Sequence, residues 1–329
     1  MLAGNVRSLA LTAAFAAVTS VATAANAAER WDMPTAYGAS NFITQAYVAF
    51  AEDVKKRTNG ELEIVVHPGG SLYQGAEILR AVREGQVPIG ARFLGAHANE
   101  DPLFGLDTIP FLATDKESAW KLYQASRTEL EKALADRGLK FLFAPVWPPQ
   151  GLFVKKEINT LEDMKGVRFR AYDTNTSRLA ELMGASPTRT EASEIAQAFS
   201  TGIADAMMAS AAIGIGQAMW DYVDYYYLVN AWLPKSVVVV NMDVWDGLDE
   251  STQNALLAAA ADAEATVWDT MEVENQRYLA TLAENGMNVV KPSDELMAGF
   301  HEIGAILTRE WLDTAGERGA AVIDAYQAK

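Results

Sequence analysis

A long uninterrupted helical pattern constrains the fold of this chain more than any other feature of its sequence. The pattern runs over 249–284, and a helix of about 36 residues extends about 54 Å at the rise of an α-helix. That length exceeds the diameter of one small domain, so we expect the helix to run along two. The 329 residues of the chain agree with this expectation, since domains of roughly 100–200 residues are usual.

The first half of the chain alternates predicted strands with predicted amphipathic helices. Strands are expected over 30–33, 61–67, 140–145 and a stretch ending at Phe93, and helices over 41–57, 75–84 and 116–137. This order predicts an α/β fold with a parallel sheet flanked by helices. Ligands of such sheets bind at the carboxyl ends of the strands, which directs attention to Tyr37, Phe93 and Trp147.

A second unit begins near Gln150 and continues the alternation. Strands are expected over 166–171, 203–208, 236–242 and 289–290, and helices over 175–183, 191–201 and 293–328. The sequence contains neither a low-complexity linker between the two units nor a convincing internal repeat. A chain that crosses between two lobes more than once would explain the missing linker.

Residues 1–27 are predicted to be a secretory signal peptide. Arg7 is their only charged residue, the stretch 9–25 is apolar or small, and Ala25-Asn26-Ala27 fits the cleavage rule. The alternative is a transmembrane anchor, which the Ala, Thr and Ser content and the cleavage site disfavour. We therefore expect a mature chain that starts near Ala28 and lies in the periplasm or outside the cell.

Charge and residue content exclude several classes of protein. Lys and Arg number 27 against 43 Asp and Glu, a formal net charge of −16, which opposes nucleic-acid binding because that requires cationic neutralisation of phosphates. The chain has no Cys, so a disulfide framework, a thiol nucleophile and Cys-ligated metals are excluded. The three histidines, His67, His97 and His301, lie far apart in the sequence, and we expect neither a metal site nor a cofactor.

No motif of a common enzyme class occurs in the sequence. The G-x-S-x-G, P-loop and H-E-x-x-H patterns are absent. Gly214 and Gly216 form a G-x-G that lacks the continuation and the acidic partner of a dinucleotide site. Because the chain is so acidic, paired carboxylates such as Glu61 and Glu63 are interpreted as residues on solvent-exposed faces and not as catalytic pairs. A secreted carboxylate-based hydrolase stays a minor alternative.

Two arginines at the end of a short alternating strand are more informative. Arg168 and Arg170 share one face of the 167–170 strand, opposite Phe169. A guanidinium presents a planar fork of donors that suits bidentate binding of a carboxylate. The alternative is that both arginines only balance surface acids, and strand position alone does not exclude it.

The sequence around Arg170 resembles a known family of transport proteins. The segments that carry the resemblance are 69–75 (GGSLYQG), 107–112 (DTIPFL), 161–170 (LEDMKGVRFR), 183–187 (MGASP), 191–195 (EASEI), 200–206 (STGIADA) and 241–248 (NMDVWDGL). In this order they are similar to segments of the extracytoplasmic solute-binding proteins of TRAP transporters, of the DctP type. The similarity covers the whole mature chain and is therefore more specific than any single motif.

This resemblance implies a two-lobed, periplasmic-binding-protein-like fold with a hinge and one long helix spanning both lobes. Lobe I would comprise residues 28–150 plus about 240–285, and lobe II residues 151–239 plus about 286–329. The lobes of the family close on a small organic acid, and the strand-end arginine at the Arg170 position pairs with its carboxylate. The bound protein delivers the acid to the membrane subunits of the permease, and none of this requires catalysis. A ligand-sensing module on the same fold is the alternative.

Departures from the family pattern bear on the ligand. Where many relatives carry Gln-Glu-Asn, this chain has Met207, Met208 and Ala209, followed by Ser210. Gly151-Leu152-Phe153 lacks the second arginine of some relatives. Sugar acids need many hydrogen-bonding partners when buried, and dicarboxylates need a second cation. We therefore favour a monocarboxylate with an apolar or aromatic body, with 2-oxo and hydroxy acids among the candidates.

The predicted site combines one carboxylate-binding arginine with aromatic and thioether side chains. Its ligand-binding residues are expected to be Arg170, Trp147, Tyr37, Phe93, Arg92, Tyr172, Met207, Met208 and Ser210. Ordinary core packing is the alternative for the aromatic residues and the methionines. Arg92 is a candidate second cation. If it faces the cleft, dicarboxylates become candidate ligands again, and strand alternation does not decide which way it faces.

Overall fold

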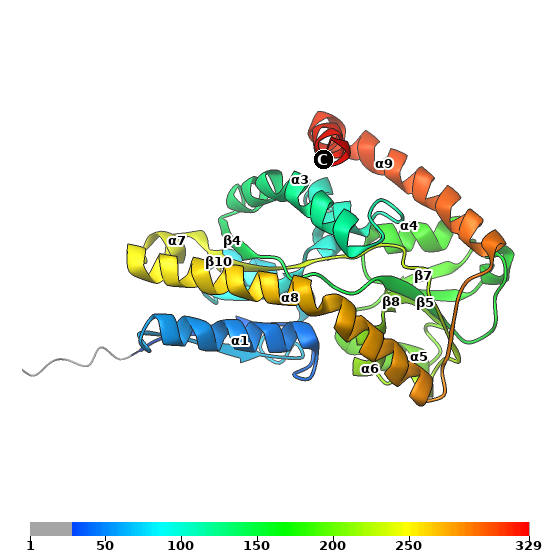
Figure 1. The fold of residues 1–329 in the computed structure, drawn as a ribbon, viewed down its shortest axis with the longest axis horizontal. Helices are drawn as coiled ribbons and strands as arrows, with labels where there is room; N and C mark the ends of the chain where they lie inside the picture. The colour runs from blue at the N-terminus through cyan, green and yellow to red at the C-terminus, as the bar shows by residue number, and fades with distance from the viewer. Residues whose placement is uncertain (1–27, 329) are drawn as a thin grey trace, which may run out of the picture.

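The computed structural model describes residues 28–328, which form two α/β lobes crossed by one long helix (Figure 1). The two-lobed architecture predicted from the sequence is confirmed. The predicted signal peptide, residues 1–27, lies outside the described residues. Within the described part of the chain, no helix combines the length and the apolar character that crossing a membrane would need.

The first lobe contains a parallel pair of strands and a three-stranded sheet. β1 (Glu29–Pro34) runs parallel to β2 (Leu62–His67), and a single bridge between Thr35 and Ala91 connects β1 to the larger sheet. The larger sheet has the order β3 (Ile89–Phe93), β10 (Ser236–Asn241), β4 (Leu139–Phe143). The helices are α1 (Phe42–Arg57), α2 (Ile78–Arg83), α3 (Lys116–Ala135) and α7 (Met242–Asp246), with short 3-10 turns between them.

The expectation of a parallel sheet is wrong at the centre of this lobe. β10 lies between β3 and β4 and pairs antiparallel with both. Because β10 enters only after the chain has crossed into the second lobe and returned, it comes from the opposite direction. Its run of Val237–Val240 is fully buried, as expected for a central strand whose two faces are covered.

The second lobe is built on one six-stranded mixed sheet. Its strand order is β11 (Asn288–Val290), β9 (Tyr225–Tyr227), β5 (Gln150–Val154), β8 (Ala206–Ser210), β6 (Arg168–Ala171), β7 (Ser186–Arg189). Its helices are α4 (Thr174–Leu182), α5 (Ile195–Ser200) and α6 (Ala211–Gly216). β6 pairs parallel with both β7 and β8, so Arg170, near the end of β6, lies where ligands of parallel strands bind.

Within residues 28–328, three segments of the chain cross between the lobes before the last helix begins. The segment before β5 and the segment after β9 run antiparallel, with a bridge between Val146 and Lys235 and a 2.8 Å hydrogen bond from Trp147 N to Pro234 O. The third is α8 (Glu250–Glu284), which begins at the Asp249 cap and contacts α1 and β4 in one lobe and α6 and β11 in the other. The helix therefore spans both lobes, as its length predicts.

The last helix, α9 (Asp294–Gln327), also contacts elements of both lobes. It packs against α4 of the second lobe and against α3 of the first, where the Tyr326 hydroxyl donates to Leu112 O at 3.0 Å. Gly316, with φ 59°, interrupts its helical geometry and lets the chain turn onto α3 (Figure 1). The expected assignment of about 286–329 to lobe II stays a prediction.

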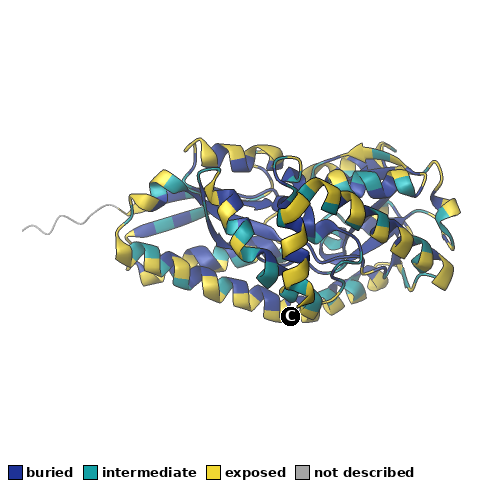
Figure 2. Cartoon of the chain, turned by 90° about the horizontal axis from the view of Figure 1, so that it is seen from above, coloured by how far each residue is buried: buried dark blue, intermediate teal, exposed yellow. Residues whose placement is uncertain are grey.

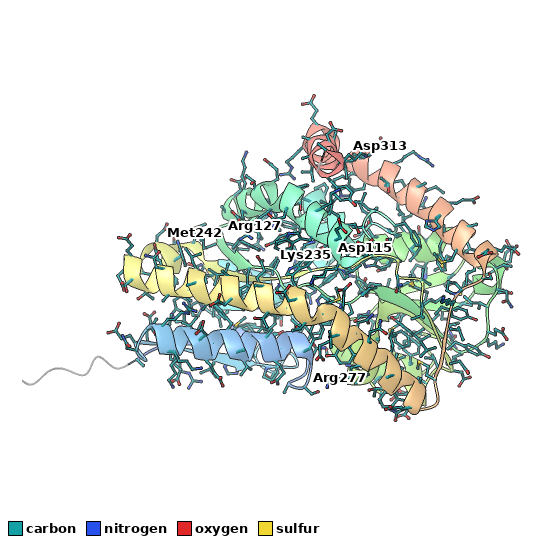
Figure 3. All side chains as sticks on the ribbon, viewed as in Figure 1. Asp115, Arg127, Lys235, Met242, Arg277 and Asp313 are labelled. Atoms are coloured by element: carbon teal, nitrogen blue, oxygen red, sulfur yellow. The ribbon has the colours of Figure 1, made fainter. Side chains whose placement is uncertain are left out.

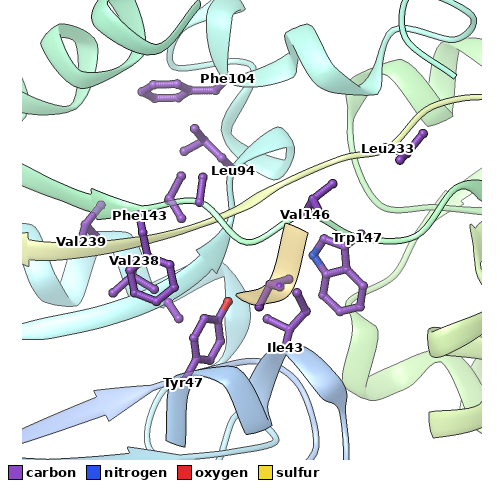
Figure 4. Packing of buried hydrophobic residues seen from close by; sticks show 14 of the residues in the cluster. Ile43, Tyr47, Leu94, Phe104, Phe143, Val146, Trp147, Leu233, Val238 and Val239 are labelled. Carbon is purple, nitrogen blue, oxygen red and sulfur yellow. The ribbon is translucent and has the colours of Figure 1, made fainter. Parts of the chain in front are cut away.

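Two buried apolar clusters stabilise the fold, and Figure 2 shows the buried residues concentrated along the strands. In the larger cluster, Tyr47 of α1 packs near Phe143, with 6.4 Å between the ring centroids, and Ile43 lies beside Trp147 (Figure 4). The smaller cluster, around Phe169 and Trp232, lies within the second lobe. Burial of apolar area stabilises a fold by roughly 25 cal/mol per Å². These clusters therefore stabilise the strands whose ends form the site.

Candidate functional site

A cavity between the two lobes gathers residues from the strand ends and from the crossing segments. Its empty volume is about 510 Å³, part of it open to solvent. The residues that line it are Tyr37, Arg92, Phe93, Ala96, Trp147, Gln150, Arg170, Tyr172, Glu191, Ala192, Ile195, Ala209, Ser210, Ile213 and Pro234. Its size lies within the range of small-molecule sites.

Seven of the nine predicted site residues line this cavity: Tyr37, Arg92, Phe93, Trp147, Arg170, Tyr172 and Ser210. Met207 and Met208 are not among the lining residues. β8 lies inside the sheet, and its alternating side chains enter opposite cores, with Met207 in the larger cluster and Met208 in the smaller one. The structure therefore places both methionines in ordinary core packing. The ligand-binding roles of the other seven stay predictions.

Arg170 is a buried cation that forms no ion pair in the part of the chain that the structure describes. Its side chain is 4 % exposed, and its Nε donates to the backbone oxygen of Thr190 at 3.0 Å. Within residues 28–328 no carboxylate forms an ion pair with its guanidinium, although the ring of Tyr172 lies 5.1 Å away. Burial lowers the pKa of the Arg170 guanidinium. A buried charge without an ion-pair partner in contact is costly, even with the carboxylates of Glu191 and Asp173 nearby, so the cavity favours an incoming anion.

Arg92 also faces the cavity, but its charge is already paired. Its Nη1 and Nη2 donate to the two carboxylate oxygens of Glu191 at 3.0 and 3.1 Å, the bidentate geometry that strengthens such pairs. Burial raises the pKa of Glu191, but the hydrogen bond and the charge of Arg92 outweigh this effect and lower it overall. Arg92 belongs to β3 and Glu191 follows β7, so the pair joins the two lobes.

Aromatic side chains form two walls of the cavity. The rings of Tyr37 and Trp147 lie 4.5 Å apart between centroids, and those of Phe93 and Tyr172 lie 5.2 Å apart at 82°. Trp147 is held by a 3.0 Å hydrogen bond from its Nε1 to Ser236 Oγ. Burial raises the pKa of Tyr37 to about 12, so this phenol remains protonated and able to donate at neutral pH.

Two neutral polar groups complete the site. The Gln150 side-chain amide donates through Nε2 to Pro148 O at 2.8 Å, which leaves its carbonyl oxygen as an acceptor. The Ser210 hydroxyl oxygen accepts from Ile213 N at 3.4 Å and keeps its own hydrogen to donate. The remaining lining is mostly alanine and isoleucine. Among the described residues that line the cavity, Arg170 is a cation without an ion pair, and it is joined by a few neutral donors and acceptors and by flat aromatic walls. This combination suits a small anion with a compact body.

The sequence reasoning had not singled out Gln150 and Glu191 as site residues. Gln150 marked only a domain boundary, and Glu191 appeared only inside the EASEI segment of the resemblance. Within residues 28–328, no group of three or more His, Asp or Glu side chains is arranged to hold a metal ion.

Comparison with known proteins identifies the family. Residues 35–313 match the family model described as bacterial extracellular solute-binding protein, family 7, named DctP. The chain belongs to this family. The resemblance noted in the sequence is thereby confirmed, and the protein is a TRAP periplasmic solute-binding protein of the kind that binds small organic acids. Periplasmic location is implied by the names of its relatives.

Among relatives of this DctP-family protein, a monocarboxylate 2-oxoacid-binding periplasmic protein of Nostoc sp. is 25% identical over 284 residues, 83% of this chain and 77% of the relative. A Bordetella pertussis extracytoplasmic solute receptor binding pyroglutamic acid is 43% identical, with a TM-score of 0.90, over 91% of this chain and 100% of the receptor. A marine metagenome TRAP solute-binding protein specific for pyroglutamate is 41% identical, with a TM-score of 0.90, over 92% and 99% of the two chains.

Proposed function

We propose that this protein captures pyroglutamate, or a closely similar cyclic monocarboxylate, and delivers it to the membrane subunits of a TRAP transporter. The observation that carries the proposal is the Arg170 guanidinium, which is buried in the interlobe cavity without a carboxylate partner within residues 28–328. Three solved structures that bind pyroglutamate, at 40–43% identity to this chain, support the choice of acid.

The chemistry of the lining fits a ring that carries one carboxylate and one amide. The carboxylate would pair with Arg170, the lactam N–H would donate to the Gln150 side-chain carbonyl, and the lactam carbonyl oxygen would accept from the Ser210 or Tyr172 hydroxyl. The ring itself would lie against the walls formed by Trp147 and Phe93. A sugar acid fits less well, since its hydroxyls would face alanine and isoleucine side chains and lose the hydrogen bonds they make in water.

Transport also fits the sequence and the family. Residues 1–27 would direct export and be removed, and the mature protein would bind its ligand in the periplasm. The acid would leave chemically unaltered, because capture and release require only closure and opening of the two lobes.

Calorimetric titration of the mature protein tests the proposal. The protein would start at Ala28 and be refolded from denaturant to remove any retained ligand, then titrated with pyroglutamate, pyruvate, glutarate and glucuronate. We expect the tightest binding for pyroglutamate, and recovery of the acid unchanged by mass spectrometry. Tighter binding of a sugar acid or of pyruvate would contradict the proposed ligand, and a converted acid would favour the hydrolase alternative.

A further inference from the structure

Two arginines face the cavity, yet only one of them is available to a ligand. Arg92 and Arg170 are each 4 % exposed, but within residues 28–328 only Arg92 has a carboxylate in contact, that of Glu191. The charged residues that line the cavity, Arg92, Arg170 and Glu191, together carry one net positive charge; the buried carboxyl of Asp173 lies near Arg170 but is not among the lining residues. A monoanion would neutralise the group, whereas a dianion would leave a buried negative charge, which is unfavourable.

The surrounding chain is shaped to hold the Arg92–Glu191 pair. A Cβ atom on Gly75 would lie 2.3 Å from Arg92 Nη1 and 2.7 Å from Glu191 Oε2, both far inside contact distance. The φ angle of Gly75 is not positive, so the absence of a side chain, not backbone freedom, is what this position requires. The first residue of η1 (Gly75–Glu77) therefore lies directly against the ion pair.

The backbone around Glu191 directs its carboxylate into the opposite lobe. Its own N–H donates to Glu194 Oε2 at 3.1 Å, at the start of the 3-10 turn η5 (Ala192–Glu194). Just before it, Arg189 Nη2 donates across the lobes to Ala96 O at 2.8 Å. A hydrogen bond within its own lobe thus holds the backbone of Glu191, while its carboxylate pairs with Arg92 of the other lobe.

We propose that Glu191 is a specificity-determining residue whose carboxylate occupies the place at Arg92 that the second carboxylate of a diacid would take. The site then accepts monoanions and rejects dianions. This inference rests on the proposed function, in which the first carboxylate binds Arg170. Glu191 acts as a built-in substitute for a ligand group, and its removal would convert Arg92 into a second ligand-binding cation.

The variant Glu191→Gln tests this directly, with pyroglutamate and glutarate as probes in calorimetric titrations. We expect the preference for pyroglutamate over glutarate to fall by about tenfold or more, as when a charge pair is rearranged in a desolvated interface. Glu157→Gln is the matched control, because Glu157 is an exposed acid of the same lobe with no cavity contact. An unchanged preference in folded Glu191→Gln would overturn the inference.

A second pair of variants decides the matter if Glu191→Gln does not fold. Arg92→Gln leaves the Glu191 charge unpaired in the cavity and is expected to weaken pyroglutamate binding by about tenfold. Adding Glu191→Gln removes that charge and is expected to recover most of the loss. A double variant that binds no better than Arg92→Gln would mean that Arg92 itself holds the ligand, and the inference would fall.

The same titrations separate this inference from the proposed function. Wild-type protein that binds neither probe would contradict the pyroglutamate proposal. In that case, glutarate binding gained by Glu191→Gln would still support the role of Glu191, and no gain would overturn it. Wild-type protein that binds glutarate more tightly than pyroglutamate would overturn both.

Discussion

Arg170 is the residue through which a carboxylate ligand would gain most of its binding free energy. Arg170→Ala is expected to weaken pyroglutamate binding by about 3–5 kcal/mol, the usual loss when one partner of a buried ion pair is removed. Arg168→Ala is the control, since Arg168 lies on the same strand but is paired with Asp205 at 2.6 Å outside the cavity. Calorimetry measures both, and normal affinity in Arg170→Ala would exclude the carboxylate clamp.

Asp173 makes the stability of the fold depend on pH. It caps α4, with Oδ1 accepting from Thr176 N at 2.7 Å, while Oδ2 is buried without a hydrogen-bond partner. Burial raises the pKa of Asp173 from 3.8 to about 6. A carboxyl with a raised pKa in the folded state stabilises the fold most below its unfolded pKa, and this contribution disappears as the pH rises through about 6.

The variant Asp173→Asn should therefore be less sensitive to pH than the wild type. Asparagine keeps the cap and removes a loss of about 2 kcal/mol between about pH 4 and pH 7, most of the full value of a shift from 3.8 to about 6. Denaturant unfolding at both pH values measures the difference. Asp115→Asn, at the exposed cap of α3 (Figure 3), is the control, and equal pH dependence in wild type and Asp173→Asn would refute the prediction.

Site residues that lie at the ends of strands could be predicted from the sequence. Site residues that are defined only by tertiary contacts could not. Tyr37, Phe93, Trp147 and Arg170 follow or end strands, so sequence alone points to them. The methionines of β8 carry no signal of which face they occupy, because both faces of that strand are covered. Glu191 is one of 43 acidic residues, and only its contact with a cation 99 positions away gives it a role.

At the scale of elements, a glycine in α9 allows this helix to approach the first lobe closely. A Cβ on Gly304 would lie 2.7 Å from Pro110 O and 2.9 Å from a ring atom of Phe111. Phe111 has φ 63° and donates its N–H to Ala231 O at 2.7 Å, so this loop is held in place and cannot easily give way.

The variant Gly304→Ala is consequently expected to reduce the free energy of unfolding by about 1–3 kcal/mol, the usual cost of overpacking. Gly216→Ala is the matched control, since no atom lies within 4 Å of its added Cβ. That control should not lose stability, because alanine is the better helix former. Urea unfolding compares the two, and equal stability of both variants would contradict the close packing described for α9.

Sequence periodicity predicted the helices better than the sheets. The long helix was expected over 249–284 and is found at Glu250–Glu284, since its period, its Asp249 cap and its length are all local properties. The position of β10 between β3 and β4 was missed. Sheet order depends on which strands pair after the chain crosses between the lobes. Local sequence patterns do not indicate such long-range pairing.

At the scale of the whole molecule, the two lobes are held together across the cavity as well as through the crossing segments. The Arg92–Glu191 pair and the hydrogen bond from Arg189 to Ala96 O both span the lobes. Arg189 is not among the residues that line the cavity, so it contributes to closure without touching a ligand there. Closure and binding are therefore separable by mutation.

The variant Arg189→Ala should lower apparent ligand affinity by opening the molecule. Because Arg189 is exposed, loss of this hydrogen bond costs only about 0.5–1 kcal/mol; it reduces the population of the closed form, and apparent affinity falls with that population. We expect ligand release about two- to fivefold faster by stopped-flow fluorescence, together with a larger radius of gyration of the ligand-free protein. Arg80→Ala is the control, because Arg80 pairs only with Glu77 and Glu84 on its own surface. If Arg189→Ala released the ligand at the wild-type rate, the hydrogen bond from Arg189 to Ala96 O would not help to hold the lobes together, and closure would rest on the crossing segments and on the remaining contacts between the lobes, such as the Arg92–Glu191 pair.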